Sequence, residues 1–150
     1  MKLRIKGNSL RLRVSRSELT RLLAGDCVEE TIHFAPQPDA RLTYALEREP
    51  SVTSPSVRYA KNRVAILIPT DQANAWGASG QVEISESIRL GELGSLELLI
   101  EKDFACLDRN DAENEDTFEN PSAVGACVPV HLTNAGFGRS ALLGFKRFLW

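Results

Sequence analysis

Apolar and polar residues alternate in short runs along most of the chain, which is the period of half-buried β-strands. In the run that ends at Val14, Leu10 and Leu12 share one face while Arg11 and Arg13 occupy the other. Turn-forming pairs such as Gly-Asn separate neighbouring runs, as they do in β-hairpins. The pattern predicts strands at residues 2–6, 9–14, 28–34, 42–47, 56–61, 63–68, 81–86 and 96–102.

Two short segments place their apolar residues at helical spacing instead. In the first, Ser15 and Glu18 form a capping-box pattern, and Gly25 supplies a stop signal. The second covers residues 70–78 and begins after Pro69. The side chains that we expect to face the core from these two helices are Leu19, Leu22, Leu23, Ala73 and Trp76.

The chain resembles itself at a shift of 54 positions, without a gap. The identical pairs are Arg4 and Arg58, Asn8 and Asn62, Ala24 and Ala78, Val28 and Val82, Glu29 and Glu83, Leu42 and Leu96, Glu47 and Glu101. Each copy reads as two strands, a helix and two strands, with repeat units at about residues 2–49 and 56–103. Because neither copy could cover its own sheet, we expect one α+β domain at residues 1–121, an eight-stranded antiparallel barrel or half-barrel. Residues 122–150 would form an extension that either docks on the domain or remains disordered.

The composition fits a folded protein. The 150 residues include 43% hydrophobic and 25% charged positions, enough to bury a core without disulfides or metal. The longest aliphatic run covers only residues 64–68, far short of a membrane span, and the alternating N-terminus is unlike a secretion signal. The sequence therefore predicts a cytoplasmic protein. The net charge of −2 hides a basic start, up to residue 22, and an acidic segment at residues 108–119.

Neither the cysteines nor any known motif indicates chemistry. Cys27, Cys106 and Cys127 are far apart, with only His33 and His131 as further ligands, so we expect small buried thiols rather than a zinc site. Glycine-rich phosphate loops, dinucleotide fingerprints, metalloprotease motifs and nucleophile elbows are all missing from the sequence. The acidic segment matches a calcium loop only in part, because a glutamate stands where the loop needs glycine, and a solvated loop is expected there.

The charged faces of the strands carry a more specific hypothesis. Basic residues follow the polar face of the first hairpin, and Glu29, Glu47, Glu83, Glu97 and Glu101 occupy the polar faces of later strands. If these faces lined a closed barrel, the lumen would hold a basic wall for phosphates and an acidic wall for a metal ion. If they face solvent, we expect cross-strand pairs of arginine and glutamate that each contribute little to stability.

The lumen arrangement, with eight strands and an internal duplication, resembles the CYTH-like triphosphate tunnel fold, whose members bind or hydrolyse triphosphates with a divalent metal. The defining Glu-x-Glu-x-Lys strand of that family is absent here. The resemblance implies phosphate binding by Arg4, Arg11, Arg13 and Arg58. It implies Mg²⁺ or Mn²⁺ binding by Glu29, Glu83, Glu97 and Glu101.

Two longer motifs carry a second resemblance. The start MKLRIKGNSLRLR and the segment LIEKDFACLD, at residues 99–108, resemble a family of short uncharacterised bacterial proteins, a domain of unknown function. The resemblance covers about residues 1–121 and implies a bacterial, cytosolic, single-domain protein without assigned catalytic residues. In the second motif, we expect Phe104 and Leu107 to pack the acidic loop against the domain, and Glu101 to pair with Lys102 or with an N-terminal arginine.

These observations favour a binding or structural module over an enzyme, with no cofactor. Its partner would be a polyanion or a protein. The acidic pI of about 5.7 and the lack of aromatic residues among the N-terminal bases disfavour nucleic acid. The alternative is a CYTH-like protein that binds or hydrolyses a triphosphate with Mg²⁺ or Mn²⁺. The oligomeric state is open at this stage.

Overall fold

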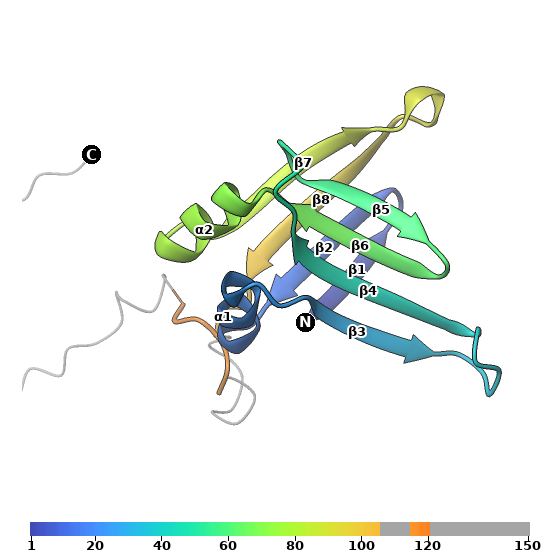
Figure 1. Ribbon diagram of the computed structural model, residues 1–150, viewed down its shortest axis with the longest axis horizontal. Helices are drawn as coiled ribbons and strands as arrows, with labels where there is room; N and C mark the ends of the chain where they lie inside the picture. Colours follow the sequence, from blue (N-terminus) through green and yellow to red (C-terminus); the bar gives the residue numbers. More distant parts are fainter. Residues whose placement is uncertain (106–114, 121–150) are drawn as a thin grey trace, which may run out of the picture.

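The computed structural model describes residues 1–105 and 115–120, and the chain has the expected α+β class. The first half contains β1 (Lys2–Lys6), β2 (Ser9–Val14), α1 (Arg16–Ala24), β3 (Val28–His33) and β4 (Arg41–Arg48). The second half contains β5 (Ser56–Ala60), β6 (Arg63–Ile68), α2 (Thr70–Ala78), β7 (Glu83–Arg89), the 3-10 turn η1 (Gly91–Leu93) and β8 (Ser95–Lys102). Both α-helices lie at the same end of the strands (Figure 1).

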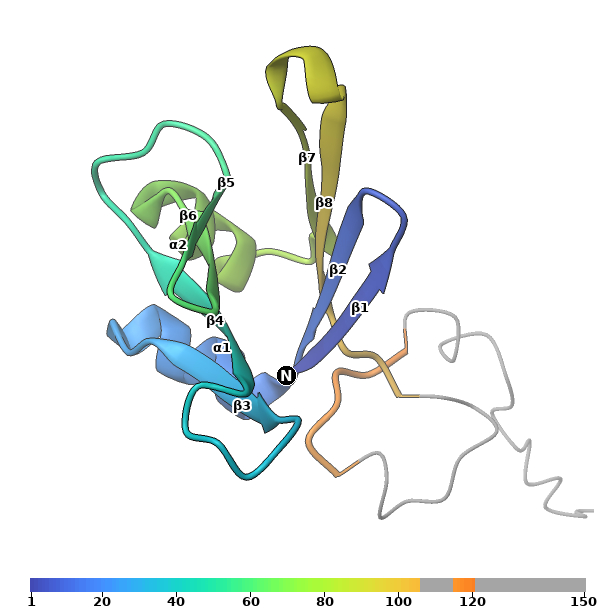
Figure 2. The same ribbon diagram turned by 90° about the vertical axis from the view of Figure 1, so that its right-hand side faces the viewer.

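The eight strands form two four-stranded sheets. Sheet A has the order β1-β2-β8-β7, and sheet B has the order β3-β4-β6-β5. Each sheet combines a hairpin from one half of the chain with a strand pair from the other half. Within the described residues each sheet has two edge strands, so these strands do not close into a barrel. The sheets diverge from the corner where the N-terminus lies, which is compatible with a half-barrel (Figure 2).

The expected antiparallel arrangement holds for four strand pairs but not for the two at the sheet centres. β2 runs parallel to β8, and β4 runs parallel to β6. A parallel pair needs a long crossover between its strands. The chain provides this because the strands of each central pair belong to different halves, and both α-helices and five further strands lie between β2 and β8 along the sequence.

Each sheet contains three strand pairings, and at an offset of 54 two of these have the same register in both sheets while the third differs. β1 and β2 pair as β5 and β6 do, and β2 and β8 pair as β6 and β4 do. Leu46 pairs with Val28, whereas its counterpart Ile100 pairs with Ile84. Val28 therefore corresponds to Ile84 and not to Val82, the partner that the gap-free alignment predicts. The sequence identity of the two valines misleads because the connection after α2 is longer than the one after α1.

The inner faces of both sheets and the apolar sides of both helices share one core. Among the expected helical core residues, Leu19, Leu22, Ala73 and Trp76 are buried, and Leu23 is partly buried against them. The predicted helix signals of α1 are also confirmed. The Ser15 hydroxyl accepts from the Glu18 N–H at 3.4 Å, the Glu18 carboxylate accepts from the Ser15 N–H at 2.9 Å, and Gly25 ends the helix with φ 105°.

Within residues 1–105 and 115–120, no helix is long and apolar enough to cross a membrane.

Candidate functional site

A concentration of positive charge covers one side of the first hairpin. Because alternate residues of a strand point to opposite faces, the leucines of β2 enter the core and the arginines between them point away from it. The same alternation applies to β1, which pairs with β2 so that Lys2 lies across from Arg13 and Arg4 across from Arg11. We call this surface the basic face; it consists of Lys2, Arg4, Lys6, Arg11 and Arg13.

Two carboxylates neutralise part of the basic face. Arg11 donates from Nη2 to Oε2 of Glu101 at 2.8 Å, and Arg13 donates from Nε to the same carboxylate, which is only 8% exposed. Lys2 donates from Nζ to Oδ2 of Asp103 at 2.6 Å. These bonds hold both guanidinium groups over β8 in fixed positions, so the cations are oriented before any ligand arrives.

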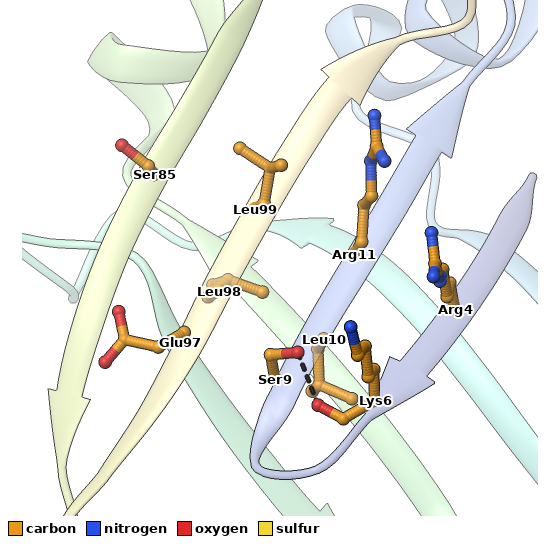
Figure 3. Close-up of a pocket in the computed structure, with 9 residues that line it drawn as sticks. All are labelled: Arg4, Lys6, Ser9, Leu10, Arg11, Ser85, Glu97, Leu98 and Leu99. Carbon is orange, nitrogen blue, oxygen red and sulfur yellow. Dashed lines mark hydrogen bonds between the residues drawn. The ribbon is translucent and has the colours of Figure 1, made fainter.

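Arg4 and Lys6 are different, since neither forms an ion pair with any residue that the structure describes. Together with Arg11 and Ser9 they border a hollow of about 390 Å³ on the outer side of sheet A (Figure 3). Arg4 stands directly across the hairpin from Arg11, and like charges in this position repel each other. An anion bound between them would relieve that repulsion.

The nearby carboxylate of Glu97 does not fill this role. Figure 3 shows it directed towards β7, away from Arg4 and Arg11. Ser95 and Ser87 each donate a hydroxyl proton to it at 2.7 Å, and these two bonds lower the pKa of Glu97 below its usual value. Glu97 is thus engaged on its own side of the hollow and leaves the cations free to bind an external group.

The four glutamates predicted to hold a metal do not come together. Glu29 lies in sheet B, where it accepts from Arg63 at 3.1 Å, and Glu101 is held by arginines. Glu83 lies across from Glu101 in the register, and Glu97 faces the serines. In the part of the chain with assigned structure, no group of three or more Asp, Glu, His or Cys side chains is arranged to hold a metal ion.

The predicted phosphate ligands separate in a similar way. Arg4, Arg11 and Arg13 share the basic face, but Arg58 lies on β5 of sheet B, with Glu49 at 4.0 Å as its ion-pair partner. Sequence reasoning also left Ser9 out of the site. The pairing of Ser9 with Lys6 in the hairpin register could have indicated it, because that register follows from the two-residue turn.

Sheet B carries its own arginine and glutamate cluster on its outer face. The Arg63 guanidinium donates to Glu29 at 3.1 Å and also to Glu47, and it lies 3.4 Å from the Cys27 sulfur. Cys27 is exposed, so the expectation that it is a buried apolar residue was wrong. It lies immediately before β3, beside charged side chains rather than in the core. Cys106 and Cys127 lie outside the described residues.

The environment of Cys27 predicts an unreactive thiol. Partial burial, followed by the negative charge of Glu47, raises its pKa to about 11. The thiolate is the nucleophile, so alkylation should become half-maximal near this pH and not near the ordinary value of 9.0. Iodoacetamide labelling from neutral to alkaline pH, read at the Cys27 peptide by mass spectrometry, measures this. Glu47→Gln should shift the profile to lower pH, and a wild-type profile centred near 9.0 would contradict the expectation.

Comparison with known proteins gives a family but no activity. No curated protein and no solved structure matches the chain. A family profile matches residues 1–122, which agrees with the resemblance indicated by the two sequence motifs. The chain belongs to this family of unknown function, DUF7009.

Proposed function

We propose that this protein is a binding module that takes an anionic ligand on the basic face of sheet A. The observation that carries the proposal is the state of Arg4 and Lys6, which border a hollow with Arg11 and form no ion pair with any described residue. Exposed cations held side by side on a rigid sheet favour phosphate or carboxylate groups, and partner carboxylates already orient Arg11 and Arg13.

A binding role fits these residues better than triphosphate hydrolysis does. The basic face belongs to an open sheet, and the glutamates suggested as metal ligands are spread over both sheets or engaged by arginine and serine. Metal-assisted phosphoryl chemistry needs carboxylates that converge on one ion. The module would therefore bind its ligand without a divalent metal.

The evolutionary origin and the cellular location of the protein are part of the same proposal. The shared pairing registers of the two sheets support an origin by internal duplication, with both repeat units forming a single domain. The motifs at residues 1–13 and 99–108 support a bacterial, cytoplasmic protein.

Thermal unfolding in the presence of tripolyphosphate tests the proposal. At a concentration of about 100 times its dissociation constant, the ligand should stabilise the native state by about 2.7 kcal/mol and raise the melting temperature. The shift should not require Mg²⁺, it should weaken with salt, and it should be largely lost in Arg4→Ala. Arg4 is exposed and unpaired among the described residues, so its removal should leave the fold intact.

The matched control is Arg58→Ala, which removes an exposed arginine from sheet B and should leave the shift unchanged. Three results would contradict the proposal: no shift with tripolyphosphate, an equal loss in both variants, or a shift that requires Mg²⁺. The last of these would favour the CYTH-like alternative.

A further inference from the structure

The basic face ends at an open sheet edge. β1 is the outermost strand of sheet A, and β2 is its only strand neighbour among the described residues. Leu3 is partly buried, and the other four residues of β1 are exposed. An edge strand presents backbone N–H and C=O groups that no strand satisfies, and a further strand can pair with them.

The backbone bonds on the other side of β2 identify which groups of β1 point outward. The Glu97 N–H donates to the Asn8 carbonyl, and the Asp103 N–H donates to the Val14 carbonyl, so the even-numbered residues of β2 turn their backbone groups to β8. The odd-numbered residues of β2 consequently face β1, where Arg11 pairs with Arg4. The remaining residues of β1, Leu3 and Ile5, therefore direct their N–H and C=O groups away from the sheet.

The side chains of β1 define what kind of strand would fit there. Lys2, Arg4 and Lys6 point to the outer face, while Leu3 and Ile5 point to the inner face, where Ile5 remains 58% exposed. A neighbouring strand would place alternate side chains beside the cations and the others beside the apolar pair. Acidic residues would suit the first set and aliphatic residues the second.

The charges also decide against a second copy of β1 as the occupant. Two β1 strands paired with each other would set lysine and arginine against lysine and arginine, and such like-charged pairs are destabilising. Lysine on an edge strand is a common device against self-pairing. An acidic strand meets no such repulsion.

We propose that β1 is a docking edge for an extended acidic segment of a partner protein, which joins sheet A as a fifth strand. The segment has about five or six residues and alternates acidic and aliphatic side chains, to match the length of β1. This inference rests on the proposed function, because Arg4 and Lys6 supply the charge attraction. It adds the backbone pairing with Leu3 and Ile5, which binding of a simple anion does not need.

The probe is a labelled peptide of about six residues that alternates glutamate and valine. We expect it to bind the full chain in a fluorescence anisotropy titration, with an affinity at least about tenfold higher than two control peptides. One control has the same composition with its glutamates and valines in separate blocks. The other has the same sequence with alternate backbone nitrogens methylated, so that it keeps its charges but cannot donate hydrogen bonds to β1. Equal binding of all three peptides would overturn strand addition.

Amide hydrogen exchange locates the contact. In the free protein the Leu3 and Ile5 amides should exchange fast, while the Arg4 amide is protected by its pairing with Arg11. Saturating peptide should slow Leu3 and Ile5 by at least about tenfold. If the Leu3 and Ile5 amides are already protected in the free protein, the proposal is overturned. Protection that increases with protein concentration would then indicate that a second copy covers this edge. Protection that is independent of concentration would indicate that a segment of this chain covers it.

The variant Ile5→Pro provides a second check. It removes one outward N–H but no hydrogen bond between β1 and β2, so the fold should persist, as its melting temperature will report. Peptide binding should fall while the tripolyphosphate shift remains. If the wild-type protein binds tripolyphosphate but not the peptide, strand addition alone is refuted. If the wild-type protein binds neither, the proposed function is refuted as well.

Discussion

Replacing Trp76 by alanine is expected to lower the free energy of unfolding by about 4 kcal/mol, the largest effect of any single truncation in the domain. Trp76 is completely buried and is the largest residue in the core. Its indole packs where α2 meets the inner faces of the sheets, so alanine would leave a cavity that the neighbouring strands cannot fill.

A second cost adds to the cavity. Lys102 is 6% exposed, and its ammonium group donates to the carbonyls of Trp76 and Ser79 at 3.1 and 2.8 Å, at the C-terminal end of α2. The ammonium also lies 5.7 Å from the centre of the Trp76 ring, a cation–π arrangement, and burial lowers the pKa of Lys102. Loss of the indole would remove one aromatic wall of this site.

Urea unfolding followed by circular dichroism measures the change for Trp76→Ala. The matched control is Tyr59→Ala, which truncates an aromatic residue that is 67% exposed and should change the free energy of unfolding by less than about 0.5 kcal/mol. Similar losses in the two variants would mean that Trp76 does not fill the core as described.

The strands and helices could be predicted from the sequence because local patterns determine them. The alternation around Leu12, the capping box at Ser15 and the stop at Gly25 all act within a few residues. The arrangement of the sheets depends on contacts between distant residues. Nothing local shows that β2 pairs in parallel with β8. This pairing joins the β1–β2 hairpin of the first half to the β7–β8 pair of the second half in one sheet.

Only the part of the candidate site that lies on a single hairpin could be predicted from the sequence. Arg4, Arg11 and Arg13 share a face because of strand alternation, whereas Arg58 follows its own hairpin into sheet B. The partner of Glu101 was left open between Lys102 and an N-terminal arginine. The structure selects Arg11 and Arg13, because Lys102, the next residue in the strand, points to the opposite face and reaches the end of α2.

The predicted packing of the second motif can be followed in part. Phe104 meets Phe118 with their ring centres 6.0 Å apart, and Phe118 packs against the core. This contact ties residues 115–120 to the end of β8, as expected from an aromatic residue that follows the strand. Leu107 lies outside the described residues.

Glu101→Gln is expected to act in opposite directions on stability and on ligand binding. The carboxylate accepts from Arg11 and Arg13, whose side chains are 36% and 43% exposed, so solvent screening limits the loss of stability to about 1 kcal/mol. The same change frees both guanidinium groups and removes the negative charge that is paired with Arg11, a residue that lines the hollow. Tripolyphosphate should then bind about fivefold more tightly, which corresponds to about 1 kcal/mol.

Isothermal titration with tripolyphosphate, together with thermal unfolding of the free proteins, separates the two effects. Glu47→Gln is the matched control, because it removes the same charge from a carboxylate that also accepts from an arginine, Arg63, but on sheet B and away from the hollow. Its affinity should change by less than about twofold. Arginines that serve only to pack the sheet would give lower stability in Glu101→Gln with no gain in affinity, and that outcome would exclude Arg11 and Arg13 as ligands of the anion. A gain confined to Glu101→Gln would mean that Glu101 competes with the ligand for Arg11 and Arg13.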